Sequence, residues 1–327
     1  MLHYFIIIYR TIFVTITKIF EQVSTVGNLF LAILSIYVFI LVGYSAKHIF
    51  KNKIDEKSFN LLSVYFLQVF LTFWGLLQRP IDTELLLAPF IYLGVIAIAL
   101  VVTFFLAHQL FSDKKEQSIA TVAALIGNTG NLGIPLGIAI FGPESIPFTT
   151  LINLMNIFIV YTLGVYFYSR GNFSIKESIK NIFKLPVLWF AILALSLNFY
   201  NVSLPKEIMS ALQMGAYASI VLQLIILGMY LHSVRLQHLN IKLIIHVNSV
   251  KFLLLPLIAF FLLQLTPLSS IIKSIIFIEI FMPLAVSNVN LGSLYNCRPK
   301  DITALIFISS LLFLAFSFVA LYVLEKL

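Results

Sequence analysis

Residues 127–137 read GNTGNLGIPLG, and residues 279–290 read EIFMPLAVSNVN. Each stretch lies inside a long apolar run and carries a proline, Pro135 or Pro283, among small and polar residues. Because proline has no amide hydrogen and clashes with the carbonyl four residues earlier, each proline is expected to break a helix. A carbonyl freed inside a membrane needs a new hydrogen-bond partner. The two stretches therefore predict two broken helices with polar groups gathered at the breaks.

The composition around these stretches is that of a membrane protein. The chain has 327 residues, of which 61% are hydrophobic and only 10% are charged, and its mean hydropathy is +1.04. A span needs about 20 apolar residues, so the length allows about ten spans and leaves no room for a large soluble domain. The net charge of +8 lies in short clusters between apolar runs, which is typical of topology signals and argues against a nucleic-acid partner. The single cysteine, Cys297, excludes an internal disulfide and a cysteine-clustered metal site.

The apolar runs predict an all-α integral membrane protein with about ten transmembrane helices. The first five are expected at 24–46, 58–78, 85–108, 117–141 and 146–168, and the second five at 183–201, 208–232, 243–266, 270–296 and 301–325. The two proline stretches then fall in the fourth helix of each half. With five helices in each half, any similarity between the halves is that of an inverted repeat.

The chain divides into four segments on this basis. Residues 1–22 form an amphipathic segment, expected to be an interfacial helix, with an eleventh span as the alternative. Residues 23–168 form the first five-helix repeat, 169–182 a loop, and 183–327 the second, inverted repeat. Fourteen Lys and Arg residues fall on alternate connections and only four on the opposite ones. The positive-inside rule therefore puts the 169–182 loop in the cytoplasm and both ends of the ten-helix unit outside.

Polar side chains beside the two breaks form the candidate substrate site. Two opposed breaks near the midplane would aim helix-end dipoles and free backbone groups at a common point. We predict that the substrate is bound by Asn128, Thr129, Asn131, Ser287, Asn288 and Asn290. The alternative is a pair of kinked helices whose small residues only permit close packing. Asn153 and Asn156, one turn apart in the fifth helix, are expected either to cap the breaks or to face the site.

Glu279 is the only acidic residue well inside a predicted span. Because a carboxylate is costly in the membrane interior, we predict a function for it, the coupling of transport to an ion. The 148-residue offset between the two prolines maps Asn131 onto Glu279. H+ is one candidate ion and Na+ another, since carboxylate and amide oxygens also suit a hard cation; a structural brace for the break is the alternative role. Lys251, near a helix end, is expected to snorkel to the surface.

The same segments resemble the auxin efflux carrier family, which includes plant PIN carriers and bacterial malonate-type transporters. The resemblance rests on the pattern NTGxLGxPL at 128–136, on VKFLLLPL at 250–257 and on MPLA at 282–285. It implies a bile-acid-symporter-like fold in which helices four and nine cross at their broken segments. Helices one, two, six and seven would form a scaffold, often dimeric, against which the other helices move in an elevator-like cycle. In this resemblance Asn128 would contact an anionic substrate, while prolines usual in the family are replaced near Gln68 and Val221.

The sequence therefore predicts a secondary transporter of a small organic anion, multi-pass in the plasma membrane and homodimeric through its scaffold helices. No cofactor is expected, and the choice between H+ and Na+ as the coupling ion is left open. An intramembrane enzyme is disfavoured because the motifs His-Glu-x-x-His, Gly-x-Gly-Asp and Gly-x-Ser-x-Gly do not occur. A channel or pore-like permease for small solutes is the alternative function.

Overall fold

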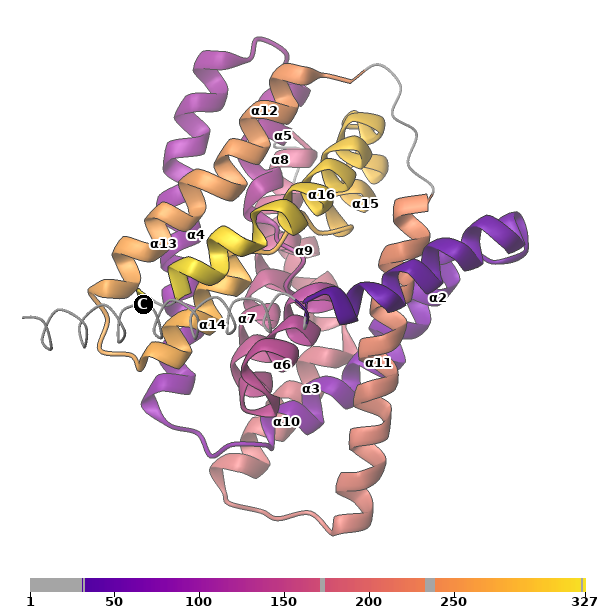
Figure 1. Ribbon diagram of the computed structural model, residues 1–327, viewed down its shortest axis with the longest axis vertical. Coiled ribbons are helices and arrows are strands. Elements are labelled where there is room, and N and C mark those ends of the chain that lie inside the picture. The colour runs from indigo at the N-terminus through magenta and orange to yellow at the C-terminus, as the bar shows by residue number, and fades with distance from the viewer. Residues whose placement is uncertain (1–30, 32, 171–173, 233–238, 325) are drawn as a thin grey trace, which may run out of the picture.

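The computed structural model describes residues 31, 33–170, 174–232, 239–324 and 326–327. Within these ranges the regular structure is all helical, apart from one isolated pair of bridged residues. Seven helices are long and apolar enough to cross a membrane, and two shorter apolar helices accompany them (Figure 1). The predicted amphipathic segment 1–22 lies outside the described residues.

The helix bounds only partly follow the predicted pattern of ten spans. The seven long helices are Ile33–Lys53; Glu56–Leu76, which contains α2 (Glu56–Leu62) and α3 (Gln68–Leu76); α4 (Thr83–Leu110); Pro143–Tyr168, which contains α7 (Ile146–Ile159) and α8 (Val165–Tyr168); α11 (Lys206–His232); Ile241–Gln264, which contains α12 (Ile241–Ser249) and α13 (Leu255–Gln264); and α16 (Pro299–Leu324). The shorter helices are Thr129–Phe141, which ends in α6 (Ile134–Phe141), and α10 (Pro186–Phe199). Four more are α5 (Lys114–Val122), α9 (Ile175–Phe183), α14 (Ser270–Phe281) and α15 (Ser287–Leu294). The predicted fourth and ninth spans are thus each divided into two pieces, and α9 occupies the stretch predicted as a loop.

Both proline stretches are broken, but only one breaks at its proline. The second loses helical geometry over residues 282–286, around Pro283. The first loses it over residues 126–128, so the prediction that Pro135 marks the break is wrong: Pro135 is the second residue of α6. The chain stays helical past Pro135 because the preceding π-helical turn, Thr129–Gly133, has already shifted the hydrogen-bond spacing from four residues to five.

The shifted break also overturns the predicted equivalence of Asn131 and Glu279. Asn131 follows the first break, in the π-helical turn, whereas Glu279 precedes the second break, in the last turn of α14. The two side chains therefore belong to opposite ends of their interrupted helices. They sit where helix dipoles have opposite signs.

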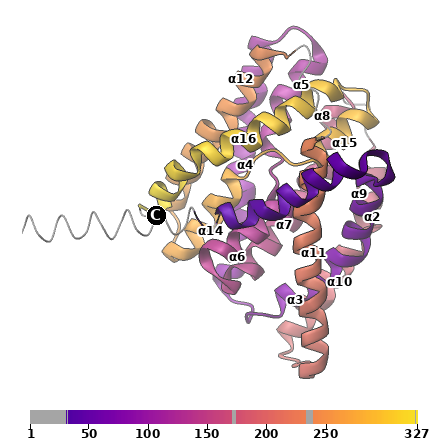
Figure 2. The same cartoon turned by 45° about the vertical axis from the view of Figure 1, so that its right-hand side comes forward.

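The helices form two packed groups (Figures 1 and 2). In one, α3 packs on α10 and α11. In the other, α4 packs on α5, α7 and α13, and α16 packs on α12, α14 and α15. The groups meet where α3 contacts α7 and where α11 contacts the turn Thr129–Gly133. The first broken segment therefore lies at the junction between the groups.

The first helix, Ile33–Lys53, joins the α3 group through two glycines at its contact with α11. A Cβ on Gly228 of α11 would overlap the carbonyl oxygen of Ile40, and a Cβ on Gly43 would overlap that of Ile225. The two backbones therefore approach more closely than any side chain at these positions permits. Such small-residue contacts are the usual basis of tight helix pairing in membranes.

We expect Gly228→Ala to lower the thermal stability of the purified protein. Inserting a methyl group into this contact forces two helices apart, and overpacking of this kind costs about 1–3 kcal/mol. Gly94→Ala in α4 is the matched control, because a Cβ there would meet its nearest atom, Leu262 Cδ2, at an ordinary 3.6 Å. Equal melting temperatures for the two variants in the same detergent would contradict the proposed close approach.

Candidate functional site

The two broken segments cross and hydrogen-bond to each other. The N–H of Asn128 donates to the carbonyl of Pro283 at 2.8 Å, and the N–H of Ala285 donates to the carbonyl of Ile126 at 3.0 Å. Gly127 and Leu284 consequently face each other as an isolated antiparallel bridge. Each unwound segment therefore supplies some of the hydrogen-bond partners that the other lost on leaving the helix.

Two asparagine side chains complete the hydrogen bonding of the crossing. Asn156 Nδ2 donates to the carbonyl of Gly127 at 2.8 Å. Asn288 Nδ2 donates to the carbonyls of Ile126 and Ala285, both at 3.1 Å, while its Oδ1 accepts from the hydroxyl of Tyr168 at 2.8 Å. Buried carbonyls left unpaired would be costly, so these amides hold the breaks open without exposing free backbone groups.

A cavity of about 300 Å³ adjoins the crossing. Its polar lining consists of amides and hydroxyls, from Asn60, Gln68, Asn128, Asn131, Asn153, Asn156, Asn290, Ser287, Tyr65 and Tyr161. Its apolar lining includes Leu61, Val64, Ile157, Val160, Leu185 and Val187. Among the described residues that line it, none is an Asp, Glu, Lys, Arg or His. The site is thus polar on one side, apolar on the other, and without a formal charge.

The cavity contains four of the six residues predicted to bind substrate: Asn128, Asn131, Ser287 and Asn290. The other two, Thr129 and Asn288, are fully buried and do not line it. The Thr129 hydroxyl donates to Asn153 Oδ1 at 3.0 Å, and the Asn288 amide is committed to the crossing. The structure therefore gives Thr129 and Asn288 a supporting position behind the cavity rather than one inside it.

Two helix N-termini lie at the crossing, beside the cavity. The helix Thr129–Phe141 begins directly after the first break and α15 begins directly after the second, and neither has a side-chain cap. The first N–H groups of a helix have no partner within the helix and carry the positive end of its dipole. Asn128 Nδ2 is also buried without a hydrogen-bond acceptor among the described residues. The N–H groups of Asn288 and Val289 at the start of α15 donate to the carbonyls of Ala285 and Val286, so the unused donor that the crossing offers to the uncharged cavity is the Asn128 side-chain amide.

Lys251 and Glu279 lie buried near the crossing but do not line the cavity. The prediction that Lys251 snorkels is wrong: the side chain is 1% exposed, and Nζ donates to the carbonyl of Ala124 at 3.2 Å. Ala124 belongs to the last turn before the first break, where a cation is stabilised by the negative end of the helix. Lys251 itself lies in the π-helical turn Val250–Leu254, just before Pro256 at the start of α13.

The Glu279 carboxylate has no hydrogen-bond partner among the described residues. It lies against the Cα of Gly133, where a Cβ would overlap Oε2. Its charge acts on Lys251 and on Tyr92, and Tyr92 in turn donates its hydroxyl to Asn156 Oδ1 at 3.4 Å. Tyr92, on which the Glu279 charge acts, is thus bonded to the same asparagine that holds the first break.

Comparison with known proteins identifies the family. Residues 28–178, which include the first broken segment, match the family described as membrane transport protein. A transporter of Methanocaldococcus jannaschii, itself described as uncharacterized, is 28% identical over 288 residues, covering 85% of this chain and 93% of that protein. The chain is therefore similar to this membrane transport protein family over residues 28–178, and to the archaeal transporter over most of its length.

The family is the auxin efflux carrier family that the motifs resemble. The protein is therefore a multi-pass membrane transporter and not an enzyme. The family match covers the first broken helix, and the archaeal relative extends the similarity over most of the second half.

Three polar side chains of the transporter's cavity were not predicted from the sequence: Asn60, Tyr65 and Tyr161. Tyr65 and Tyr161 lie in π-helical turns, Ser63–Leu67 and Val160–Gly164. A π-helical turn inserts one extra residue and rotates the face that a helix presents, and such turns are frequent at functional sites. Helical periodicity alone gives no signal for them, although a tyrosine inside an apolar span was a visible polar group.

We expect substitutions of Asn288 and Asn290 to have different effects, although the two residues are only two positions apart on α15. Asn288 supports the crossing, whereas Asn290 lines the cavity. Asn288→Ala removes the side-chain hydrogen bond from two buried carbonyls, each of which keeps a backbone donor, and it removes the acceptor of the buried Tyr168 hydroxyl. A buried polar group left unpaired costs about 1–3 kcal/mol, so the variant should have a lower melting temperature. Asn290→Ala alters an exposed cavity side chain and should leave the melting temperature almost unchanged. A stable Asn288→Ala variant would refute the supporting role.

Proposed function

We propose that the transporter is a secondary carrier of a small organic anion, which binds in the cavity beside the crossing. One observation carries the proposal. The buried Nδ2 of Asn128 lacks an acceptor, at the point where two uncapped helix N-termini adjoin the cavity. An unpaired amide donor beside the positive ends of two helices fits an anionic oxygen.

The lining favours a single carboxylate on an apolar body. Because the described lining has no Lys, Arg or His, the negative charge of the substrate would be stabilised only by hydrogen bonds from amides, hydroxyls and backbone N–H groups. Such a set suits one negative charge better than two, since a second carboxylate would be desolvated without a countercharge. The apolar side chains Leu61, Val64, Ile157 and Val187 would contact the remainder of the molecule. A dicarboxylate is therefore the less favoured substrate.

The packing supports an elevator-like cycle. The α3 group and the α4 group meet at the cavity, where Asn60, Tyr65 and Gln68 come from the Glu56–Leu76 helix and the asparagines of the crossing from the other group. Movement of one group against the other would change the side from which the cavity opens. We propose the α3 group as the scaffold and as the homodimer contact, two inverted five-helix repeats as the underlying plan, and a cytoplasmic 169–182 segment in the plasma membrane.

Coupling is assigned to Glu279 together with Lys251. The ammonium of Lys251 already places a positive charge at the carbonyl end of the first interrupted helix, which is where a bound metal cation would be attracted. A tethered ammonium at this point favours H+ over Na+ as the coupling ion. The Glu279 carboxylate, buried without a hydrogen-bond partner among the described residues, is the group that would accept the proton.

We expect Asn128→Ala to weaken substrate binding without unfolding the transporter. A hydrogen bond to a charged group contributes about 1.5–3 kcal/mol, so the dissociation constant should rise roughly ten- to hundredfold. The measurement is a thermal-shift screen of monocarboxylates and dicarboxylates, followed by calorimetric titration of the best ligand. Asn52→Ala, at an exposed position outside the cavity, is the control and should bind like the unmodified chain. If both variants bind with unchanged affinity, the crossing is a structural kink and the anion site lies elsewhere.

We expect Glu279→Gln to remove the pH dependence of substrate binding and to impair proton-driven uptake, because glutamine imitates the protonated acid. Glu177→Gln, at an exposed position on α9, should change neither. Uptake into liposomes is measured with an imposed pH gradient and, separately, with an imposed Na+ gradient. Unchanged pH dependence and gradient sensitivity in Glu279→Gln would show that Glu279 is only a brace, and uptake driven by Na+ alone would exclude proton coupling.

A further inference from the structure

A second cavity, of about 240 Å³, lies between the end of α4, the first turns of α5 and the end of the Pro143–Tyr168 helix. The basic side chains of His108, Lys114 and Arg170 line it, together with the rings of Phe104, Tyr166 and Phe167. It shares no lining residue with the cavity at the crossing. None of its described lining residues is acidic. This second cavity is therefore cationic, in contrast to the first.

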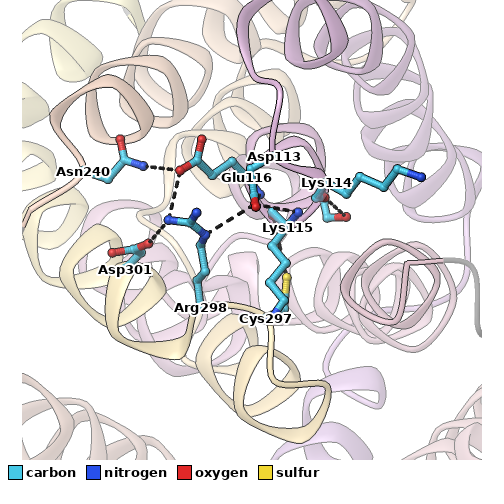
Figure 3. A network of polar contacts seen from close by, with 9 residues as sticks. Asp113, Lys114, Lys115, Glu116, Asn240, Cys297, Arg298 and Asp301 are labelled. Carbon is cyan, nitrogen blue, oxygen red and sulfur yellow. Dashed lines mark hydrogen bonds and ion pairs between the residues drawn. The ribbon is translucent and has the colours of Figure 1, made fainter.

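The positive charge of the second cavity is not neutralised by the acidic residues nearby. Asp113 and Glu116 flank Lys114 in sequence, but their carboxylates pair with Arg298, at 3.4 and 2.9 Å (Figure 3). Asn240 also donates to Glu116 Oε1 at 2.9 Å. Hydrogen bonds from the backbone, chiefly from Glu116, and the nearby Arg298 guanidinium lower the pKa of Asp113. Both carboxylates are thus committed to Arg298.

Lys114 points away from this network in Figure 3. Neither Lys114 nor Arg170 forms an ion pair with any described residue. Gln117, Ser118 and Thr121 follow Lys114 at helical spacing and line the same cavity. This face of α5 is therefore polar, and none of the described residues lining the cavity beside it carries a negative charge. The first turn of α5 consequently has ion-paired carboxylates on one face and, on the other, a lysine without an ion pair to any described residue.

The second cavity lies where the apolar surface of the protein ends. The side chains of Val101, Phe105 and Leu110 on α4 are exposed, as expected for a lipid-facing surface, and the charged residues follow directly in the sequence. Partly exposed Phe104 and Tyr166 form the wall of the cavity. Aromatic rings beside Lys and Arg are typical of the level at which lipid headgroups lie.

We infer that the second cavity binds the headgroup phosphate of an anionic phospholipid. The Arg170 guanidinium presents a fork of donors that suits phosphate oxygens, and the Lys114 ammonium adds a point charge. Basic pockets between helices at a membrane surface are suited to anionic headgroups. The acyl chains would extend along Phe104, Phe105 and Val101, a surface that free phosphate does not use. Bound lipid would tie α5, which leads into the first break, to the helix that carries Asn153 and Asn156.

The test compares lipids on the purified full-length transporter. Phosphatidylglycerol, phosphatidylcholine and inorganic phosphate are titrated separately in the same detergent, and the melting temperature and the lipids retained in native mass spectrometry are recorded. Phosphatidylglycerol should stabilise the unmodified chain and be retained, whereas phosphatidylcholine and inorganic phosphate at equal concentration should do neither. The double variant Lys114→Gln with Arg170→Gln should bind phosphatidylglycerol at least tenfold more weakly.

Two further variants make the result specific. Lys53→Gln with Lys300→Gln removes the same charge from exposed positions outside the cavity and should bind phosphatidylglycerol like the unmodified chain. Lys114→Arg keeps the charge and should retain binding. Equal losses in the two double variants would overturn the inference in favour of general surface charge, and stabilisation by inorganic phosphate equal to that by lipid would overturn it in favour of a soluble anion. Failure of this test leaves the anion site at the crossing untouched, because the two cavities share no lining residue.

Discussion

The structure depends on how two stretches of unwound backbone satisfy their hydrogen bonds inside a membrane. No water is available there, so every N–H and carbonyl released from a helix must find a partner in the protein. The segments around Gly127 and Leu284 solve this by bonding to each other and to Asn156 and Asn288. The crossing is therefore a rigid polar centre, and the surrounding helices have to pack around it.

The same crossing separates two kinds of helix end. The N-termini that follow the breaks adjoin the uncharged cavity, with Asn128 as an unused donor. The carbonyl end before the first break is met by Lys251, and Glu279 lies at the end of α14. Helix ends of opposite sign attract ligands of opposite charge. The helix N-termini after the breaks therefore suit an anion, and the carbonyl ends before the breaks suit the proposed proton-binding pair of Lys251 and Glu279.

The sequence predicted the helical membrane fold, the two interruptions and the family, because hydropathy, proline and the motif around Asn128 are local signals. It also predicted Asn128, Asn131, Ser287 and Asn290 near one site, which the structure brings together in one cavity. It failed where the answer depends on rotation about a helix axis. The π-helical turns move the first break away from Pro135, bring Tyr65 and Tyr161 into the cavity and are the setting in which Lys251 is buried. Thr129 and Asn288 were assigned to the substrate because polarity alone does not distinguish a ligand contact from a bond that supports the backbone.

The crossing itself is tested most directly by a cross-link between the paired segments. Gly127 and Leu284 face each other in an antiparallel bridge, and the residues on either side of them form the hydrogen bonds. In such a pair the Cα atoms are about 4.5 Å apart. This distance is short enough for a disulfide. Cysteines at both positions, in a chain lacking Cys297 and carrying a protease site in the 169–182 segment, should hold the two halves together after cleavage under oxidising conditions. A cysteine pair at Gly127 and Leu257, which is exposed on α13, should release them. Separation of the Gly127–Leu284 pair, with each single variant folded, would contradict the crossing on which the account rests.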